Sequence, residues 1–325
     1  MENIVELKGV VMRFGDFVAV DGIDMAIKRG EIYGILGPNG AGKTTAINMM
    51  LGLLEQTSGK ITISGLDTKK EINKIKMMIG FMTQETVVDQ DLTAEENLEI
   101  TGRLYHIEEG ELRREIDGAL MESDLEKFRK VRAGTFSGGM QRRLNLVRSM
   151  MHSPKILILD EPTTGLDVQN RVSMWKKIKE LNEKGLTVIL TTQYLEEADA
   201  LCDRISIIDH GKIIAHGTPA ELKRMVGSGD VLEISTKVDQ VERICKMLKA
   251  KFKLDSVNAS DKITCVIEKN ATLTLSRISA ELDKEKIQVN SIGLHLPTLD
   301  DVFIKLTGST MRDTLGDNRK TIKMR

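Results

Sequence analysis

The chain has 325 residues, a net charge of −1 at pH 7, 41% hydrophobic residues and 29% charged residues. This composition is ordinary for a globular protein, and the length accommodates two domains. The balanced charge excludes a bulk electrostatic attraction to nucleic acid or anionic lipid. No apolar run approaches the roughly 18 residues that a bilayer crossing needs. Three widely spaced cysteines match neither a disulfide framework nor a metal site and are typical of a reducing cytosol.

Two alternating runs, residues 4–14 and 20–27, open the chain and predict an antiparallel strand pair at a sheet edge, with Gly15-Asp16 in the turn. The apolar run 32–36 then predicts a buried strand, and 46–51 predicts a helix. A glycine-rich stretch joins this strand to this helix, and it has the strongest functional pattern in the chain.

That stretch has the spacing of a phosphate-binding loop, in the strand–turn–helix context that such a loop requires. Its glycines let backbone N–H groups curl around an anion, and the following helix adds the positive end of its dipole. Lys43 is expected to reach the β- and γ-phosphates, and the Thr44 hydroxyl to hold Mg²⁺. The alternative, a glycine-rich turn that contains a lysine by chance, has odds on the order of 1%. The expected nucleotide-binding residues are Gly37, Pro38, Asn39, Gly40, Ala41, Gly42, Lys43, Thr44 and Thr45.

A heavily charged region with helical patterns follows over residues 93–132, with Thr93 as an N-cap and Glu96 in its capping box. We expect a helical subdomain inserted into the α/β core, at about residues 85–136. Helices and apolar strands then alternate at residues 138–151, 156–159, 168–184, 186–191 and 204–208. This alternation predicts a mainly parallel sheet flanked by helices. The inward residues expected in the second of these helices are Val172, Trp175, Ile178 and Leu181.

Two acids, Asp160 and Glu161, end the apolar strand 156–159. Ligands bind at the carboxyl ends of strands in open α/β sheets. Asp160 is therefore expected to act as a direct or indirect Mg²⁺ partner, and Glu161 to orient or deprotonate the attacking water. Without the phosphate loop, an acidic strand end facing solvent would be the simpler interpretation.

A second glycine-rich helix start lies at Ser137-Gly138-Gly139. Ser137 is expected to cap this helix, whose N–H groups and positive dipole end could face an anion. Taken alone, a capped helix with nothing bound would be the simpler interpretation.

These motifs, in this order over residues 4–225, resemble the ATP-binding subunit of an ABC transporter. The phosphate loop resembles Walker A, residues 156–161 resemble Walker B with the catalytic glutamate, and Ser137-Gly138-Gly139 resembles the signature motif. The resemblance also assigns Phe14 to adenine stacking, Gln84 to the Q-loop and Asp167 to the D-loop. It implies ATP and Mg²⁺ as cofactors, with the metal near Thr44, Gln84 and Asp160.

Two departures narrow the resemblance. Gln193 occupies the position of the family's switch histidine, and Met140 replaces the signature glutamine. With these two features and the stretch 297–303, the sequence is similar to the drug-resistance exporter ATPases typified by daunorubicin resistance. This narrower resemblance extends to about residue 308. The implied catalytic set is Lys43, Glu161 and Gln193.

After a glycine-rich hinge at 227–229, the pattern runs strand, helix, strand, strand, helix, strand, which is the ferredoxin-like arrangement. Thr298 then caps a final helix, with Asp301 completing its box. We expect its apolar face to dock the small domain onto its own ATPase core or onto a sister subunit. The residues expected on this face are Leu299, Val302, Phe303 and Leu306.

The expected fold is therefore α/β: a P-loop ABC-type ATPase core over residues 1–228, with a mainly parallel sheet, an antiparallel edge subdomain and the helical insert. A small C-terminal α+β domain over residues 229–308 and a flexible tail over 309–325 follow.

The resemblance implies an ATP-hydrolysing, energy-coupling subunit of an exporter for drug-like or hydrophobic small molecules. Two copies would close around ATP and drive a separate integral membrane permease, which would hold the chain at the cytoplasmic face of the membrane, with no nucleic acid as partner. The alternative is a soluble ABC ATPase of DNA repair, iron–sulfur assembly or ribosome work. A long coiled-coil insert or a second ATPase core would favour that class, and neither is present in the sequence. Glu161 argues against a third class, a non-hydrolysing nucleotide sensor.

Overall fold

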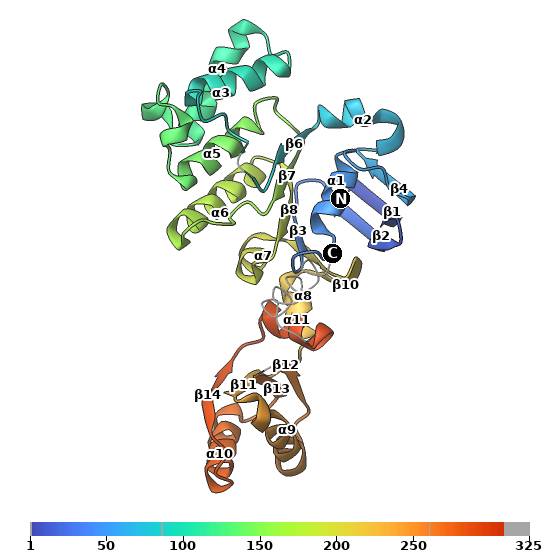
Figure 1. Cartoon of the computed structure of the whole chain (residues 1–325), viewed down its shortest axis with the longest axis vertical. Coiled ribbons are helices and arrows are strands. Elements are labelled where there is room, and N and C mark those ends of the chain that lie inside the picture. The colour runs from blue at the N-terminus through green and yellow to red at the C-terminus, as the bar shows by residue number, and fades with distance from the viewer. Residues whose placement is uncertain (1, 86, 260, 309–325) are drawn as a thin grey trace. The chain divides into compact units, whose positions relative to one another are not determined.

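The computed structural model describes residues 2–85, 87–259 and 261–308. The described residues fall into two compact units, one within 2–37 and 41–213 and the other within 38–40 and 214–308 (Figure 1). The expected flexible tail at 309–325 lies outside the described residues. The units are defined by compactness alone, and the domain bounds 1–228 and 229–308 stay a prediction.

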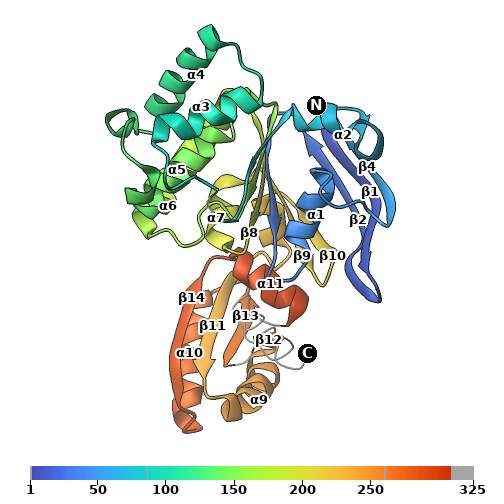
Figure 2. The same ribbon diagram turned by 45° about the horizontal axis from the view of Figure 1, so that its top comes forward.

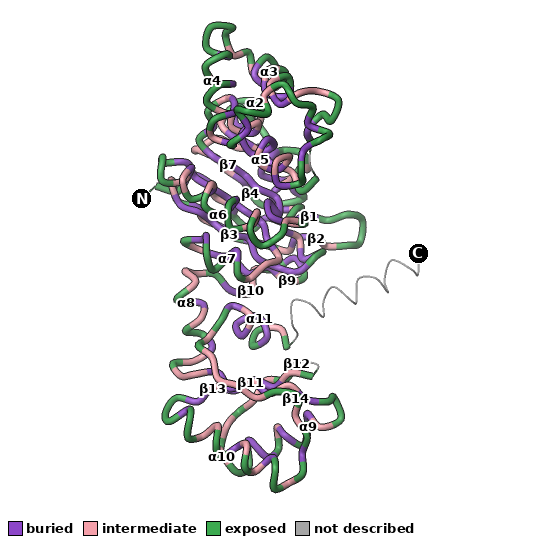
Figure 3. The backbone as a smooth tube through the Cα atoms, turned by 90° about the vertical axis from the view of Figure 1, so that its left-hand side faces the viewer, coloured by how far each residue is buried: buried purple, intermediate pink, exposed green. Residues whose placement is uncertain are grey.

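Six strands form one sheet in the order β10-β9-β3-β8-β7-β6, and those from β9 to β6 lie in the first unit (Figure 2). Its neighbours from β9 to β6 pair in parallel, as the alternating pattern predicted. Every residue of β3, β7 and β8 is buried, and Figure 3 shows buried backbone along β3 and β7. Burial on both faces explains why these runs are continuously apolar. The strands are β3 (Ile32–Leu36), β6 (Ile79–Met82), β7 (Ile156–Asp160), β8 (Thr187–Thr192), β9 (Arg204–Asp209) and β10 (Lys212–Gly217).

A separate antiparallel sheet in the order β2-β1-β4-β5 forms the edge subdomain. The predicted hairpin is confirmed: β1 and β2 pair antiparallel, and Gly15-Asp16 forms the turn between them. The strands are β1 (Asn3–Phe14), β2 (Phe17–Lys28), β4 (Ser58–Ile63) and β5 (Leu66–Asp67), and helix α2 (Thr68–Lys76) follows them.

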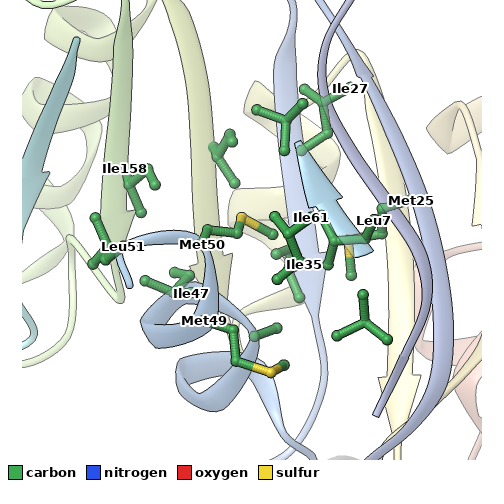
Figure 4. Packing of buried hydrophobic residues seen from close by; sticks show 14 of the residues in the cluster. Leu7, Met25, Ile27, Ile35, Ile47, Met49, Met50, Leu51, Ile61 and Ile158 are labelled. Atoms are coloured by element: carbon green, nitrogen blue, oxygen red, sulfur yellow. The ribbon is translucent and has the colours of Figure 1, made fainter. Parts of the chain in front are cut away.

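Helix α1 (Lys43–Met50) packs within a large apolar cluster of the first unit. Figure 4 shows Ile47, Met49 and Met50 of α1 between side chains of the two sheets. Residues from the parallel sheet include Ile35 and Ile158, and residues from the antiparallel sheet include Leu7, Met25, Ile27 and Ile61. Because all three of these α1 side chains are fully buried, the helix that carries the phosphate loop has a fixed place.

Helices α3, α4 and α5 share an apolar cluster of their own, and α3 and α4 lie within the predicted helical insert at about residues 85–136. The predicted capping box is present, since the Thr93 side chain accepts from the Glu96 N–H while the Glu96 carboxylate accepts from the Thr93 N–H. The elements are α3 (Ala94–Leu104), α4 (Glu109–Glu122), the 3₁₀ turns η1 (Glu126–Phe128) and η2 (Ala133–Thr135), and α5 (Gly138–Arg148).

Helix α6 (Val168–Glu183) and the short helix α7 (Leu195–Leu201) complete the first unit. One inward residue was predicted wrongly: Val172 is 53% exposed, whereas Met174 is buried at 2% exposure. Met174, Ile178 and Leu181 recur at i, i+4 and i+7, and so stay on one helix face. The predicted residues are spaced by three, and because an α-helix has 3.6 residues per turn, such a series moves around the helix and leaves the buried face.

The second unit has the predicted strand–helix–strand–strand–helix–strand order and a four-stranded sheet in the order β12-β13-β11-β14. Its paired strands are antiparallel. Apolar residues of β11, α9 and α10 meet in one cluster, among them Leu232, Ile244 and Ile278. The elements are β11 (Asp230–Thr236), α9 (Val238–Met247), the π-helical turn η3 (Leu248–Phe252), β12 (Ser256–Ala259), β13 (Lys262–Ile267), α10 (Ala271–Lys284) and β14 (Val289–His295).

The last helix, α11 (Leu299–Thr307), packs against α8 (Pro219–Arg224) within the second unit. The predicted Thr298–Asp301 box is present, and the Lys305 Nζ donates to the Met225 carbonyl at 2.9 Å. Three of the four predicted inward residues, Leu299, Val302 and Phe303, are buried. The fourth is wrong: Leu306 is 38% exposed, and Ile304 is buried in its place.

Candidate functional site

The phosphate loop runs from the end of β3 to the start of α1, and two of its glycines are required by their surroundings. A Cβ on Gly37 would lie 2.2 Å from the carbonyl oxygen of Ile208. Gly42 has φ +105°, and a Cβ there would lie 2.7 Å from the carbonyl oxygen of Ala19. Backbone this close leaves no room for a side chain, so the glycine spacing found in the sequence is a packing requirement as well as a conformational one.

Asp160, at the end of β7, is buried beside two hydroxyl groups. The Thr44 Oγ1 donates to its carboxylate at 3.2 Å, and the Thr191 hydroxyl donates to it from the neighbouring strand β8. Mg²⁺ prefers such oxygen ligands, and usually takes only one or two carboxylates from the protein. The donor set of Thr44 and Asp160 therefore fits the metal that accompanies a nucleotide.

Lys43 lies with its ammonium group between the loop and Glu161. Its Nζ donates to the Gly37 carbonyl at 2.8 Å and lies 3.4 Å from the Glu161 Oε1. Both side chains are buried. Burial lowers the pKa of Lys43, and the nearby Glu161 carboxylate opposes this shift. Lys43 is thus a desolvated cation held next to the expected phosphate position.

Glu161 has a backbone φ of +48°, in the left-handed region that residues other than glycine rarely adopt. Its N–H donates to the Thr191 Oγ1 at 3.1 Å. Holding such a conformation costs on the order of 1–3 kcal/mol and is found chiefly at functional sites.

Three side chains converge on one oxygen of Glu161. Gln84, Thr164 and Gln193 lie with a donor 3.5, 3.0 and 3.3 Å, respectively, from its Oε2. The structure therefore brings together six residues that the sequence analysis singled out from four separate stretches. They are Lys43, Thr44, Gln84, Asp160, Glu161 and Gln193.

The remaining predicted residues lie in two other places. Ser137 caps α5, its Oγ accepting from the Met140 N–H at 3.3 Å. The next turn packs against α6, because a Cβ on Gly139 would lie 2.6 Å from the Asn170 Oδ1. Asp167 caps α6 and accepts from the Asn170 N–H at 2.8 Å, and this hydrogen bond lowers the pKa of Asp167. Ser137, Gly138, Gly139 and Asp167 therefore gather where α5 and α6 begin. Phe14 lies at the end of β1 and is 48% exposed.

Sequence reasoning missed two residues that build the site, Arg142 and Thr191, and it assigned Thr164 only to the D-loop stretch 164–167, without its contact to Glu161. Thr191 sits opposite Asp160 in the parallel pairing of β7 and β8, a register that the sequence does not display. Arg142 reaches the carbonyls of Thr83 and Thr164, at 3.3 and 3.4 Å. It joins the stretches that carry Gln84 and Glu161, and burial lowers its pKa.

Comparison with known families identifies this arrangement. The model of the ABC transporter family matches residues 20–164, and that of the "ATP-binding protein DrrA1-3-like, C-terminal domain" matches residues 217–307. The chain belongs to the ATP-binding proteins of ABC transporters, a family of ATPases.

Its relatives narrow this class to the drug-resistance subgroup that the sequence analysis predicted. The chain is 38% identical to the daunorubicin resistance ATP-binding protein DrrA2 of Streptomyces coeruleorubidus, over 95% of this chain and 97% of the relative. It is 36% identical to the linearmycin resistance ATP-binding protein LnrL of Bacillus subtilis (strain 168), over 95% of this chain and 100% of the relative. The soluble repair, assembly and ribosome alternatives find no support among these relatives.

A solved structure supports the predicted fold. A dimeric ATP-binding cassette in a post-hydrolysis state, bound to ADP and Pi, matches with a TM-score of 0.60 and 28% identity. The match covers 66% of this chain and 98% of that one. The P-loop ATPase fold is thereby confirmed. Across the described residues, none of the helices combines the length and the apolar character that a bilayer crossing requires.

Proposed function

We propose that this chain hydrolyses ATP as the energy-coupling subunit of an exporter. The observation that carries the proposal is the cluster in which the buried Lys43, Asp160 and Glu161 meet Thr44, with Gln84 and Gln193 on the Glu161 carboxylate. Its parts have the chemistry of phosphoryl transfer to water: N–H donors and a cation for phosphate, oxygen ligands for a metal, and a carboxylate for the water.

Each residue then has a role in the reaction. The loop from Gly37 to Thr45 binds the phosphates through its backbone N–H groups, and Lys43 reaches the β- and γ-phosphates. Thr44 and Asp160 hold Mg²⁺, with Gln84 beside it. When bound, the metal neutralises charge on the phosphates.

The ion pair between Lys43 and Glu161 suggests how nucleotide prepares the base. A bound phosphate gives Lys43 a more highly charged anionic partner than the carboxylate it faces now. Glu161 is then released to orient or deprotonate the attacking water through its carboxylate. Gln193 donates to the γ-phosphate from the switch position and cannot itself take a proton.

The site is completed by a second copy of the chain. We propose that ATP lies between the phosphate loop of one copy and Ser137-Gly138-Gly139 of the other, with Asp167 at the same interface and Phe14 stacked on adenine. The dimeric state of the ADP-bound and Pi-bound cassette supports this arrangement. Residues 1–228 form the nucleotide-binding domain, and residues 229–308 the accessory domain.

The relatives named for daunorubicin and linearmycin resistance support a hydrophobic small molecule as cargo. In this proposal the chain binds a separate integral membrane permease at the cytoplasmic face of the membrane. Affinity purification of the tagged chain from detergent extracts tests this point. Recovery of an integral membrane protein supports export, and recovery of ribosomes or DNA in its place contradicts it.

The hydrolytic assignment is tested with three variants of the purified chain. Glu161→Gln should bind ATP yet release phosphate at least about a hundredfold more slowly, because the base is lost while the phosphate ligands stay. The closed pair should then persist, which static light scattering with ATP would detect. Lys43→Ala should instead weaken nucleotide binding itself, because it removes a point charge from the phosphates. The matched control is Glu183→Gln on an exposed glutamate of α6, which should behave as wild type. Normal hydrolysis by Glu161→Gln would remove Glu161 from the mechanism.

A further inference from the structure

A buried glutamate that has no role in the proposed reaction lies close to the site. Glu197, in the first turn of α7, has an exposed fraction of 0%. Its Oε1 accepts from the Thr163 hydroxyl at 2.7 Å and from the Trp175 indole Nε1 at 2.9 Å. Burying a carboxyl group costs free energy unless it is hydrogen-bonded. The segments that these hydrogen bonds connect therefore indicate what Glu197 does.

Its partners connect two segments that both end at the reactive carboxylate. Thr163 lies between Glu161 and Thr164, and the Thr164 hydroxyl reaches the Glu161 Oε2 at 3.0 Å. Glu197 lies four residues after Gln193, whose amide reaches the same Oε2 at 3.3 Å. Segments 161–164 and 193–197 are therefore joined twice, once at the site and once behind it.

The contact at the site is the weaker of the two. A single 3.3 Å contact from a glutamine on the short turn between β8 and α7 restrains that side chain little. The contact behind the site is shorter, at 2.7 and 2.9 Å, and is made to two donors by a Glu197 side chain that is itself fully buried. It anchors the first turn of α7 and thereby the backbone that carries Gln193.

A second contact restrains the same turn from the same helix. The Arg171 guanidinium of α6 lies over the ring of Tyr194, 5.3 Å from its centroid. Tyr194 directly follows Gln193 and precedes the start of α7. Helix α6 thus contacts the switch segment on both sides of Leu195, through Arg171 and through Trp175.

We propose that Glu197 is a positioning residue for hydrolysis, which fixes Gln193 against Glu161 by tying α7 to Thr163 and Trp175. This inference rests on the proposed ATPase function of the site. Glu197 touches none of the reacting atoms in this scheme, so its effect has to pass through Gln193. A positioning role can therefore be distinguished from a contribution to stability alone, because only the positioning role depends on Gln193.

The test compares steady-state ATP hydrolysis in single and double variants of the full chain. Glu197→Ala should lower kcat roughly tenfold, about the effect of one hydrogen bond to a charged group, with the KM for ATP within about twofold of wild type. Glu197→Gln keeps a carbonyl acceptor for both donors and should retain most of the activity. Met174→Ala on α6 is the matched control, because it removes a buried side chain that takes no part in these contacts. It should lower stability while leaving kcat close to wild type.

A double-variant comparison decides whether the effect passes through Gln193. In a Gln193→Ala background, Glu197→Ala should lower kcat by no more than about twofold, because the group it positions is already gone. Two additive losses would overturn the proposal, as would equal losses in kcat for Glu197→Ala and Met174→Ala.

Tryptophan emission gives a readout that does not depend on hydrolysis. Trp175 is the only tryptophan in the chain, and its indole N–H binds Glu197 directly. The emission maximum should shift in Glu197→Ala and stay in place in Glu197→Gln. If Glu197→Ala leaves the emission unchanged, the contact is absent and the proposal fails. If the wild-type chain binds ATP but does not hydrolyse it, the proposed function fails instead, and the emission result still reports whether the contact exists.

Discussion

At the scale of single residues, Glu161 combines several features that cost folding free energy. It combines a left-handed backbone, near-complete burial and a lysine 3.4 Å away. The backbone conformation is strained, and the buried carboxylate would be costly without the lysine beside it. A fold that needed only a strand end at this position could place a small polar residue there at less cost. The arrangement is better explained by a carboxylate that must be held in one place and released when phosphate arrives.

The first prediction concerns Gln193. Gln193→Ala should lower kcat roughly tenfold with little change in the KM for ATP, since a hydrogen-bond donor to the γ-phosphate is lost while the binding loop stays intact. Gln193→His should remain active and gain a pH dependence between about pH 6 and 7, because imidazole titrates there and an amide does not. Hydrolysis measured from about pH 5.5 to 8.5 checks both. If Gln193→Ala hydrolyses ATP with the wild-type kcat, Gln193 takes no part in hydrolysis and is only a loop residue.

The second prediction follows from the buried carboxyl group of Glu197. Burial raises the pKa of Glu197 above 4.5, although the hydrogen bonds from Thr192, Thr163 and Trp175 and the charge of Arg171 oppose this shift. The folded state thus holds this proton more tightly than the unfolded state. Its contribution to stability is full below the unfolded pKa of about 4.5 and is lost as the pH rises through the folded pKa.

Glu197→Gln has no such proton to lose. Its free energy of unfolding, relative to wild type, should therefore rise with pH above about 4.5 and level off beyond the folded pKa. Urea unfolding at steps from about pH 4.5 to 8 measures this difference. Glu183→Gln, on an exposed glutamate of α6, is the matched control. A difference that is independent of pH for Glu197→Gln would mean that the carboxyl group titrates alike in both states.

At the scale of elements, the sequence predicted what local patterns determine. The glycine spacing before α1, the Thr93 and Thr298 capping boxes and the apolar strands were all found as expected. The βαββαβ order of the second unit was also predicted, because alternation and helical periodicity switch cleanly there. Helix α2 was missed, since Ile75 is its only buried large apolar residue and no apolar stripe marks it.

The errors arise where tertiary packing decides. Val172 and Leu306 are apolar and near the expected helical phase, yet both are exposed, since the packed faces are centred on Met174 and Ile304. Thr191 and Arg142 complete the site from elements whose neighbours only the strand order reveals. Sequence motifs can therefore locate the reacting groups, whereas the residues that orient them depend on which strands and helices become neighbours.

The third prediction concerns helix α11. Phe303 is fully buried at 0% exposure, so Phe303→Ala should lower the free energy of unfolding by about 3 kcal/mol or more. Leu306→Ala on the same helix is the matched control, and its 38% exposure predicts a loss of about 1 kcal/mol or less. Urea unfolding followed by far-UV circular dichroism measures both losses, and tryptophan emission reports the first unit alone, because Trp175 lies there. The dichroism midpoint should fall in Phe303→Ala while the emission midpoint stays. Equal losses for the two variants would show that α11 is not stabilised by its buried face.

At the scale of the whole molecule, the ATP-handling residues and the segment from β11 to α11 are separate along the chain. Every residue proposed to act on ATP precedes Tyr194, whereas the ferredoxin-like sheet and α11 follow residue 229. The match to a drug-resistance relative covers 95% of the chain and therefore includes most of this segment. The match to the ADP-bound and Pi-bound cassette covers only 66% of the chain. Residues 230–307 therefore contribute none of the residues proposed to act on ATP, and assembly with the membrane partner is the role we propose for them.

The last prediction tests that division of labour by truncation after Gly227. The cut removes β11 to α11 but leaves α8, whose Leu222 is buried in the full chain. All proposed catalytic and nucleotide-binding residues remain, so the truncated chain should still bind and hydrolyse ATP. It should fail to assemble with the membrane partner, measured as the fraction of tagged chain that sediments with membranes in its native host.

Loss of α11 would also uncover an apolar side chain on α8, and aggregation could then imitate failed assembly. A second truncated version with Leu222→Gln removes that apolar surface and separates the two outcomes. If this version stays monodisperse and hydrolyses ATP but remains off the membrane, residues 229–308 serve assembly. A truncated chain that binds the membrane partner and exports as well as the full chain would refute that role.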